Sequence, residues 1–111
     1  MRDGNPVPSG HDGMGAFSAG RGKTVLIRNH ELKPDDIVED GLIPVAHTKG
    51  TVYDPEATGG TTTLWVWRNG HLLWDQVSLS GTLDNCAGGE TPWQTWLTCE
   101  EDTAILSKPH G

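Results

Sequence analysis

Two strand-like segments joined by Asn69-Gly70 are the feature that most constrains how this 111-residue chain can fold. The segments are TTTLWVWR, residues 61–68, and HLLWDQVS, residues 71–78, and both are rich in β-branched and aromatic residues. Asn-Gly between two such runs is typical of a hairpin with a type I′ turn, because both central residues of that turn have positive φ. We therefore expect a β-hairpin from Leu64 to Asp75 that turns at Asn69-Gly70.

Two further segments have the composition of strands. Lys23 to Asn29 (KTVLIRN) is a short aliphatic and β-branched run, and a strand there would place His30 and Glu31 at its exit. Trp93 to Glu101 (WQTWLTCEE) alternates in a way that suits a strand with two different faces. A shorter run, Thr103 to Leu106, is expected to pair with it. Because no stretch of ten or more residues has a helical period, the predicted fold class is all-β.

The remaining segments are expected to be irregular. Gly accounts for 15 of the 111 residues, against an average share of about 7%. Residues 1–22 are interpreted as an irregular N-terminal segment with a turn at Asp12-Gly13, and residues 81–92 as a glycine-rich loop. Residues 32–60 contain three prolines and four glycines, which predicts a loop with one brief extended piece around Ile43 to His47.

Charge and hydrophobicity exclude several classes of function. The formal net charge of -7 argues against a nucleic-acid-binding surface, which needs clustered Lys and Arg. The longest apolar runs are far shorter than the roughly 18 residues that a membrane span needs. The first ten residues, MRDGNPVPSG, have no apolar core and so do not have the pattern of a signal peptide.

Three short motifs are rich in residue types that bind metal ions: Asn29-His30-Glu31, Asn85-Cys86-Ala87-Gly88-Gly89 and Cys99-Glu100-Glu101-Asp102. Carboxylates suit hard cations such as calcium, whereas a thiolate suits iron or zinc. The glycines that follow Cys86 would let the backbone approach an ion closely. From the residues alone, a structural role is favoured over metal binding for each motif, and a disulfide between the two cysteines is the preferred interpretation.

The segment from Gly81 to Asp102, GTLDNCAGGETPWQTWLTCEED, resembles the signature of the PhoX family of bacterial alkaline phosphatases. In that signature an NCA-(G/N)-G segment leads into TPWGTWLTCEE, so Gln94 stands where the family often has glycine. Other landmarks occur in the family's order: His11-Asp12-Gly13-Met14, the NHE that ends at Glu31, and Gly59-Gly60-Thr61-Thr62. The resemblance covers nearly the whole chain.

The resemblance implies a partial β-propeller of two to three blades, preceded by the long irregular N-terminal segment. Residues 1–111 would then be a fragment of a single propeller domain, with the remainder of the propeller missing from this chain, because a propeller has at least four blades. It also implies a phosphoester hydrolase that is exported to the periplasm or the extracellular space. Its substrate would be a phosphate ester, and its cofactors calcium and iron.

Carried over to this sequence, the resemblance implies that Cys86 is a thiolate ligand of iron and therefore not part of a disulfide. Glu31, Glu100 and Glu101 are the candidate carboxylate ligands, and which of the two adjacent glutamates binds is left open because strand alternation sends them to opposite faces. Cys99 is expected to be a small buried residue. The alternative functions are a non-enzymatic calcium-binding propeller fragment and a truncated product without a function of its own.

Overall fold

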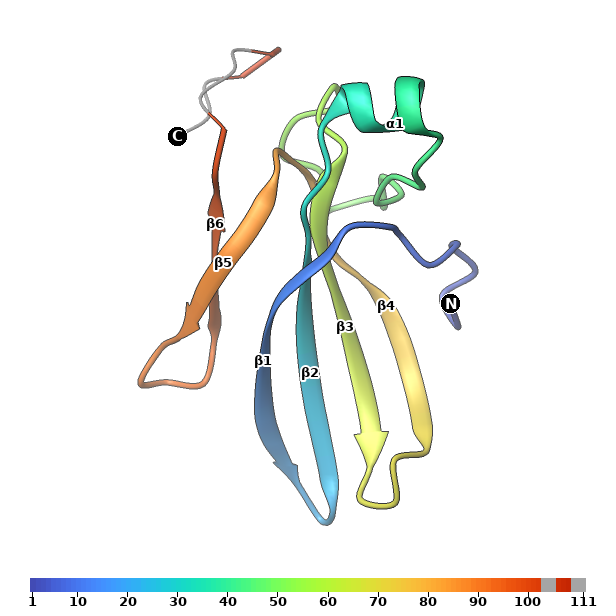
Figure 1. Cartoon of the computed structure of the whole chain (residues 1–111). Helices are drawn as coiled ribbons and strands as arrows, with labels where there is room; N and C mark the ends of the chain where they lie inside the picture. Colours follow the sequence, from blue (N-terminus) through green and yellow to red (C-terminus); the bar gives the residue numbers. More distant parts are fainter. Residues whose placement is uncertain (103–105, 109–111) are drawn as a thin grey trace.

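The computed structural model describes residues 1–102 and 106–108, and nearly half of these residues form strands (Figure 1). The elements in chain order are β1 (His11–Gly20), β2 (Lys23–His30), α1 (Pro34–Asp40), β3 (Gly59–Trp67), β4 (Leu72–Thr82), β5 (Asn85–Glu90) and β6 (Trp96–Glu100). Strands β1 to β4 form a four-stranded antiparallel sheet in the order β1-β2-β3-β4, and β5 pairs with β6 in a separate two-stranded sheet. The strand-rich fold is confirmed.

The predicted hairpin is present, but its turn differs from the one expected. Strand β3 pairs with β4 with Leu64 opposite Asp75. Gly70 has φ +86°, whereas Asn69 is not among the residues with positive φ, so the turn is not type I′. The Gly70 N–H donates to the Trp67 carbonyl (2.7 Å) and the Trp67 N–H to the His71 carbonyl (2.8 Å), which is the pattern of a three-residue loop closed by a left-handed glycine. The Asn69 side chain accepts a hydrogen bond from the His71 N–H (2.9 Å) and holds this arrangement.

The N-terminal segment is not irregular throughout, because residues 11–20 form β1 and pair with β2 along its whole length. In the same way, the glycine-rich loop predicted for residues 81–92 contains β5. Both strands were missed because glycine lowers the strand propensity of a segment. Here pairing with a neighbouring strand stabilises each of them in spite of that low propensity. The run expected at Thr103 to Leu106 falls mainly on residues 103–105, outside the described part of the chain.

The loop predicted for residues 32–60 contains the short helix α1. Pro34 stands in its first turn, where a missing N–H costs nothing, and Gly41 ends it in the left-handed conformation. The Asp36 carboxylate accepts a hydrogen bond from the Lys33 N–H (2.8 Å) and closes the first turn. The extended piece expected around Ile43 to His47 is not a strand, although Val45 donates a hydrogen bond to the Thr58 carbonyl (3.0 Å).

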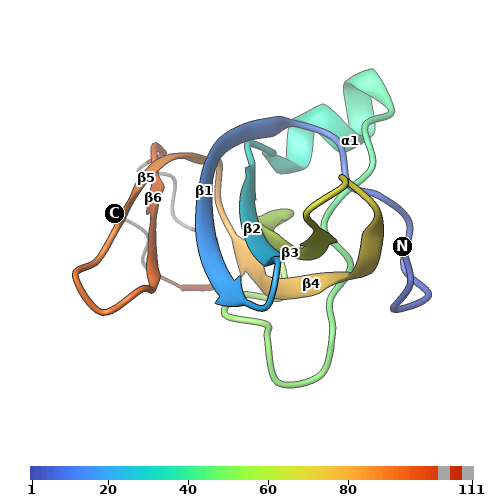
Figure 2. The same cartoon turned by 90° about the horizontal axis from the view of Figure 1, so that it is seen from below.

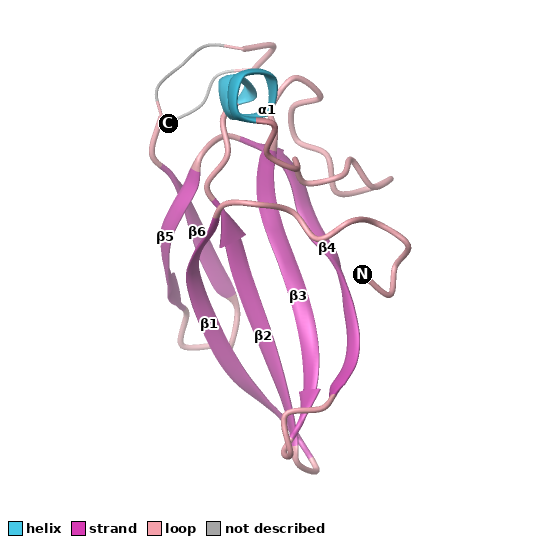
Figure 3. Cartoon of the chain, turned by 45° about the vertical axis from the view of Figure 1, so that its right-hand side comes forward, coloured by secondary structure: helices cyan, strands magenta, loops and turns pink. Residues whose placement is uncertain are grey.

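The sheet is strongly twisted when it is viewed along its strands (Figure 2), and α1 lies beyond the strand ends on the same side as the β4–β5 connection (Figure 3). The apolar core is small and lies under α1, where Leu32, Val45 and Val77 are fully or nearly buried. A four-stranded antiparallel sheet is the usual unit of a propeller blade. The structure contains one such sheet and one hairpin, so it does not establish a circular arrangement of blades.

Candidate metal centre

The candidate site lies where four strand ends meet: the start of β1, the end of β2, the start of β5 and the end of β6 (Figure 1). Backbone hydrogen bonds hold the segments together there. The Asp84 N–H donates to the Leu32 carbonyl (3.1 Å), and the Glu101 N–H donates to the Asp84 carbonyl (3.3 Å). The Glu31 N–H donates to the Gly10 carbonyl (2.7 Å), which fixes the chain just before β1. Acidic residues that are distant in sequence are therefore neighbours in space.

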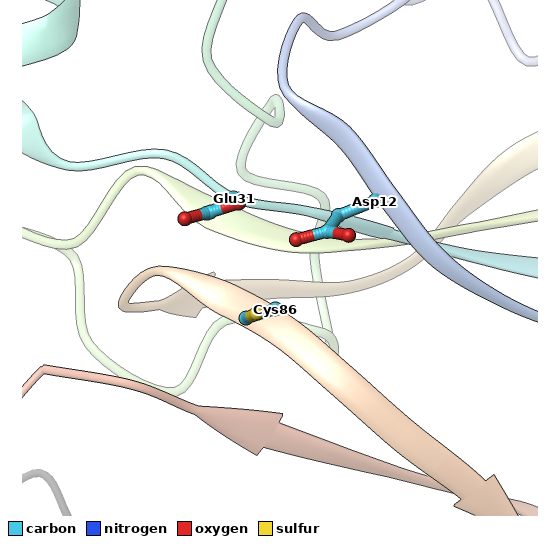
Figure 4. A group of neighbouring side chains, drawn as sticks. All are labelled: Asp12, Glu31 and Cys86. Atoms are coloured by element: carbon cyan, nitrogen blue, oxygen red, sulfur yellow. The ribbon is translucent and has the colours of Figure 1, made fainter.

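Two groups of potential ligands share Glu31. In the first, one ligand atom each of Asp12, Glu31 and Cys86 lies within 4.8 Å of the other two. Figure 4 shows these three side chains converging from β1, the end of β2 and β5. In the second group one carboxylate oxygen each of Glu31, Asp84 and Glu101 lies within 4.8 Å of the other two. Carboxylates alone suit calcium, and a thiolate among carboxylates suits a softer metal such as iron.

The close approach of β1 and β5 depends on Gly13. A Cβ atom at this position would lie 2.7 Å from the Cys86 carbonyl oxygen, which is shorter than any ordinary contact. The absence of a side chain at Gly13 therefore lets the Cys86 backbone lie against β1. Of the two glycines after Cys86, Gly88 also has a packing role, because a Cβ at this position would lie 2.5 Å from the Trp96 ring. Gly88 makes room for an indole.

The protonation behaviour of the site reflects a local excess of negative charge. The pKa of Glu31 is raised to about 7, mainly because its carboxyl group shares a hydrogen bond with Asp12 and also because of burial and repulsion from Asp84. The pKa of the Cys86 thiol is raised to about 12 by hydrogen bonds to Asp12 and Glu101. A bound cation would reverse both effects, since it favours the carboxylate and the thiolate. The donor set therefore fits a metal ion.

Lys33 supplies a positive charge at the rim of the second group. Its ammonium nitrogen lies 3.3 Å from an Asp84 oxygen and 3.4 Å from an Asp102 oxygen. Asp84 is buried and its pKa is raised, chiefly by that burial, while Lys33 acts in the opposite direction. The ion pairs hold the Asp84 carboxylate in one orientation beside Glu31.

Three of the four ligands proposed from the sequence lie in these groups: Glu31, Cys86 and Glu101. Glu100 lies in neither group. It is opposite Asn85 in the β5–β6 ladder, and its carboxylate accepts a hydrogen bond from the Leu83 N–H (2.6 Å). Glu100 nevertheless lines a cavity of about 180 Å³ beside Cys86 together with Glu101.

Both cysteines are free, as expected from the resemblance. Cys86 is half-buried, and it shares the first group with Glu31. The expectation that Cys99 is buried is wrong, because Cys99 is exposed, although it lines the same cavity as Cys86. Trp96, Thr98 and Glu100 form the partly covered face of that strand, so alternation turns Leu97 and Cys99 outward.

Two acidic residues of the site, Asp12 and Asp84, were not among the ligands proposed from the sequence. Asp12 was interpreted as part of a turn, although it stands in the His11-Asp12-Gly13-Met14 landmark. Asp84 directly precedes Asn85-Cys86 and has φ +56°, a left-handed conformation that Asp tolerates better than most residues. Both aspartates stand within segments that carry the family resemblance, and this position was the available signal.

The family model described as alkaline phosphatase PhoX matches residues 2–78 and 73–108. No curated protein and no solved structure matches the chain. Among the described residues no helix has both the length and the apolar character to cross a membrane. Since the two matched segments together span nearly the whole sequence, the chain belongs to the PhoX family of alkaline phosphatases.

Proposed function

We propose that this chain supplies part of the metal centre of a phosphoester hydrolase that uses calcium and iron. The observation that carries the proposal is the convergence of the Cys86 thiol with the carboxylates of Asp12 and Glu31, within 4.8 Å, in a chain of the PhoX family. A thiol among carboxylates is an unusual donor set for a purely structural cluster of acids. The same membership supports export to the periplasm or the extracellular space as part of the proposal.

In this proposal Cys86, Asp12 and Glu31 hold iron, while Glu31, Asp84 and Glu101 hold calcium. When bound, the ions would supply positive charge that polarises a phosphate ester and holds the attacking oxygen. The chain itself contributes the placement of the proposed ligands. Lys33 keeps the Asp84 carboxylate turned toward Glu31, and the backbone hydrogen bonds from Asp84 and Glu101 keep the acidic segments side by side.

The proposal is tested by metal binding to paired cysteine variants. Cys86→Ser should bind iron(II) more weakly than wild type. The loss of affinity should exceed about 10- to 100-fold, which is typical when a residue outside the ligand set is changed. Cys99→Ser is the matched control, because Cys99 is exposed and belongs to neither group of potential ligands, so its replacement should leave binding unchanged. Isothermal titration under reducing, oxygen-free conditions measures both.

Equal iron affinity in Cys86→Ser and wild type would contradict the iron site. Hydrolysis of a chromogenic phosphate ester by the complete protein then separates the two functional classes. A complete protein that binds calcium and iron but hydrolyses no ester would instead be a non-enzymatic cation-binding propeller.

A further inference from the structure

Asn29 is a fully buried residue near the end of β2, and its amide group makes four hydrogen bonds. The nitrogen donates to two carbonyl groups on β5, those of Cys86 (3.0 Å) and Ala87 (2.9 Å). The oxygen accepts from two side chains on β6, the Trp96 indole N–H (3.0 Å) and the Thr98 hydroxyl (2.8 Å). A single amide therefore joins the large sheet to both strands of the second hairpin.

The two carbonyl groups that Asn29 binds belong to a stretch of β5 that is out of register with β6. The register of this ladder shifts between Asn85 and Gly88, which marks a bulge at Cys86 and Ala87. A bulge leaves local backbone groups without partners and re-aims the side chains that it carries. Because Gly13 lets the Cys86 backbone lie against β1, the bulge also sits directly beside Asp12.

We infer that Asn29 is a positioning residue for the thiolate of Cys86: by donating two hydrogen bonds to the carbonyl groups of the bulge, it aims the sulfur at Asp12 and Glu31. The inference rests on the proposed function, in which Cys86 binds a metal. Asn29 does not itself belong to either group of ligands. Groups just outside a ligand set orient the ligands in this way in many metal sites.

The chemistry of the amide gives a sharp test. Asp has nearly the same shape as Asn, but a carboxylate only accepts hydrogen bonds. In Asn29→Asp the bonds from Trp96 and Thr98 remain possible, while the Cys86 and Ala87 carbonyls would face a carboxylate. The substitution therefore removes the contacts to the bulge and retains those to β6. Trp96→Phe is the complementary variant, because it removes one bond to β6 and leaves both bonds to the bulge.

The experiment loads the full chain with cobalt(II), whose bond to a thiolate gives a charge-transfer absorption that carboxylates do not produce. Asn29→Asp should weaken cobalt affinity by about 10- to 100-fold and reduce this absorption at saturating metal. Trp96→Phe should keep the absorption at wild-type intensity, even if its thermal midpoint falls. Circular dichroism establishes that each variant is folded.

The outcomes separate this inference from the proposed function. If Cys86→Ser keeps the absorption of wild type, Cys86 is not a ligand and both proposals fail. If Cys86→Ser abolishes the absorption and folded Asn29→Asp retains it with wild-type affinity, only the role of Asn29 is overturned. Should Asn29→Asp not fold, Asn29→Ser takes its place, since it removes the amide without adding a buried charge. The same loss of absorption supports the inference, and a wild-type spectrum overturns it.

Discussion

The buried imidazole of His30 shows how one residue of the NHE segment holds the strand ends beside the site. Its Nδ1 lies 2.7 Å from the Ser9 carbonyl oxygen and must donate to it, and its Nε2 lies 2.9 Å from the Thr62 hydroxyl oxygen. In the neutral ring, Nε2 accepts from that hydroxyl. The pKa of His30 is lowered to about 4, first because of burial, which outweighs the favourable bond to Ser9. Asn29, His30 and Glu31 thus have three separate tasks: to dock β5, to fix the segment before β1, and to offer a carboxylate.

We predict that His30 makes the chain less stable in acid. His30 takes up a proton near pH 6.5 in the unfolded chain and only near pH 4 in the folded chain. The contribution of neutral His30 to the free energy of unfolding is therefore complete above pH 6.5 and is lost as the pH falls toward 4. The loss amounts to at most about 3 kcal/mol. Urea unfolding of wild type and His30→Gln at several pH values measures it. The difference between the two proteins should shrink as the pH falls, and taking this difference cancels the opposite contribution of Glu31, which both proteins share.

The exposed His71 provides the control for this prediction. His71→Gln should keep the same pH dependence as wild type. If the free energies of unfolding of wild type and His30→Gln differ by the same amount from pH 7 to pH 4, His30 is not held neutral by the fold.

At the scale of the elements, the β3–β4 turn depends on Gly70. With φ +86°, this residue has a backbone conformation that costs other L-residues roughly 1–2 kcal/mol. A Cβ atom added at Gly70 would have no other atom within 4 Å, so Gly70→Ala should reduce the free energy of unfolding by that conformational cost alone. Gly89→Ala is the control, because Gly89 has equally open surroundings and no positive φ. Equal effects of the two substitutions in urea unfolding would contradict this account.

The strands that sequence predicted well are those whose own residues favour a strand. The β3–β4 hairpin and β2 are rich in Val, Thr, Ile and Trp, and they appear close to the predicted positions. Strands β1 and β5 contain several glycines, and their pairing comes from distant partners that no local pattern reveals. Helix α1 has seven residues, too few to produce a helical period, and only Pro34 and Gly41 at its ends marked it.

The same distinction holds for the site. Glu31, Cys86 and Glu101 stand in motifs that could be recognised in the sequence, and the structure places all three in the two groups of potential ligands. Asp12 and Asp84 join them only because backbone contacts bring the start of β1 and the β4–β5 connection to the end of β2. Long-range contacts of this kind are not encoded in the spacing of neighbouring residues. The sequence motifs therefore identified some candidate ligands, and the candidates that only the topology brings to the site were missed.

For the molecule as a whole, we predict that the 111-residue chain hydrolyses phosphate esters poorly or not at all. A propeller has at least four blades, whereas the described part of this chain forms one four-stranded sheet and one two-stranded sheet. Aromatic side chains also remain open to solvent: Trp74 is 42% exposed and Trp93 is 73% exposed. The purified chain, supplied with calcium and iron(II), should release no more product from a chromogenic phosphate ester than Cys86→Ser does. Turnover that disappears in Cys86→Ser would show instead that the chain is sufficient for catalysis.

The division of the ligands between two hairpins has a consequence for the order of folding. Asp12 lies in β1 and Glu31 directly follows β2, whereas Asp84, Cys86 and Glu101 belong to the β5–β6 hairpin or its borders. Each hairpin closes a short loop and can form early, but the docking of one on the other joins residues more than fifty positions apart and is slow. Neither hairpin alone carries a complete set of ligands. A metal ion would therefore bind tightly only after docking, and its binding would stabilise the docked arrangement of the two hairpins.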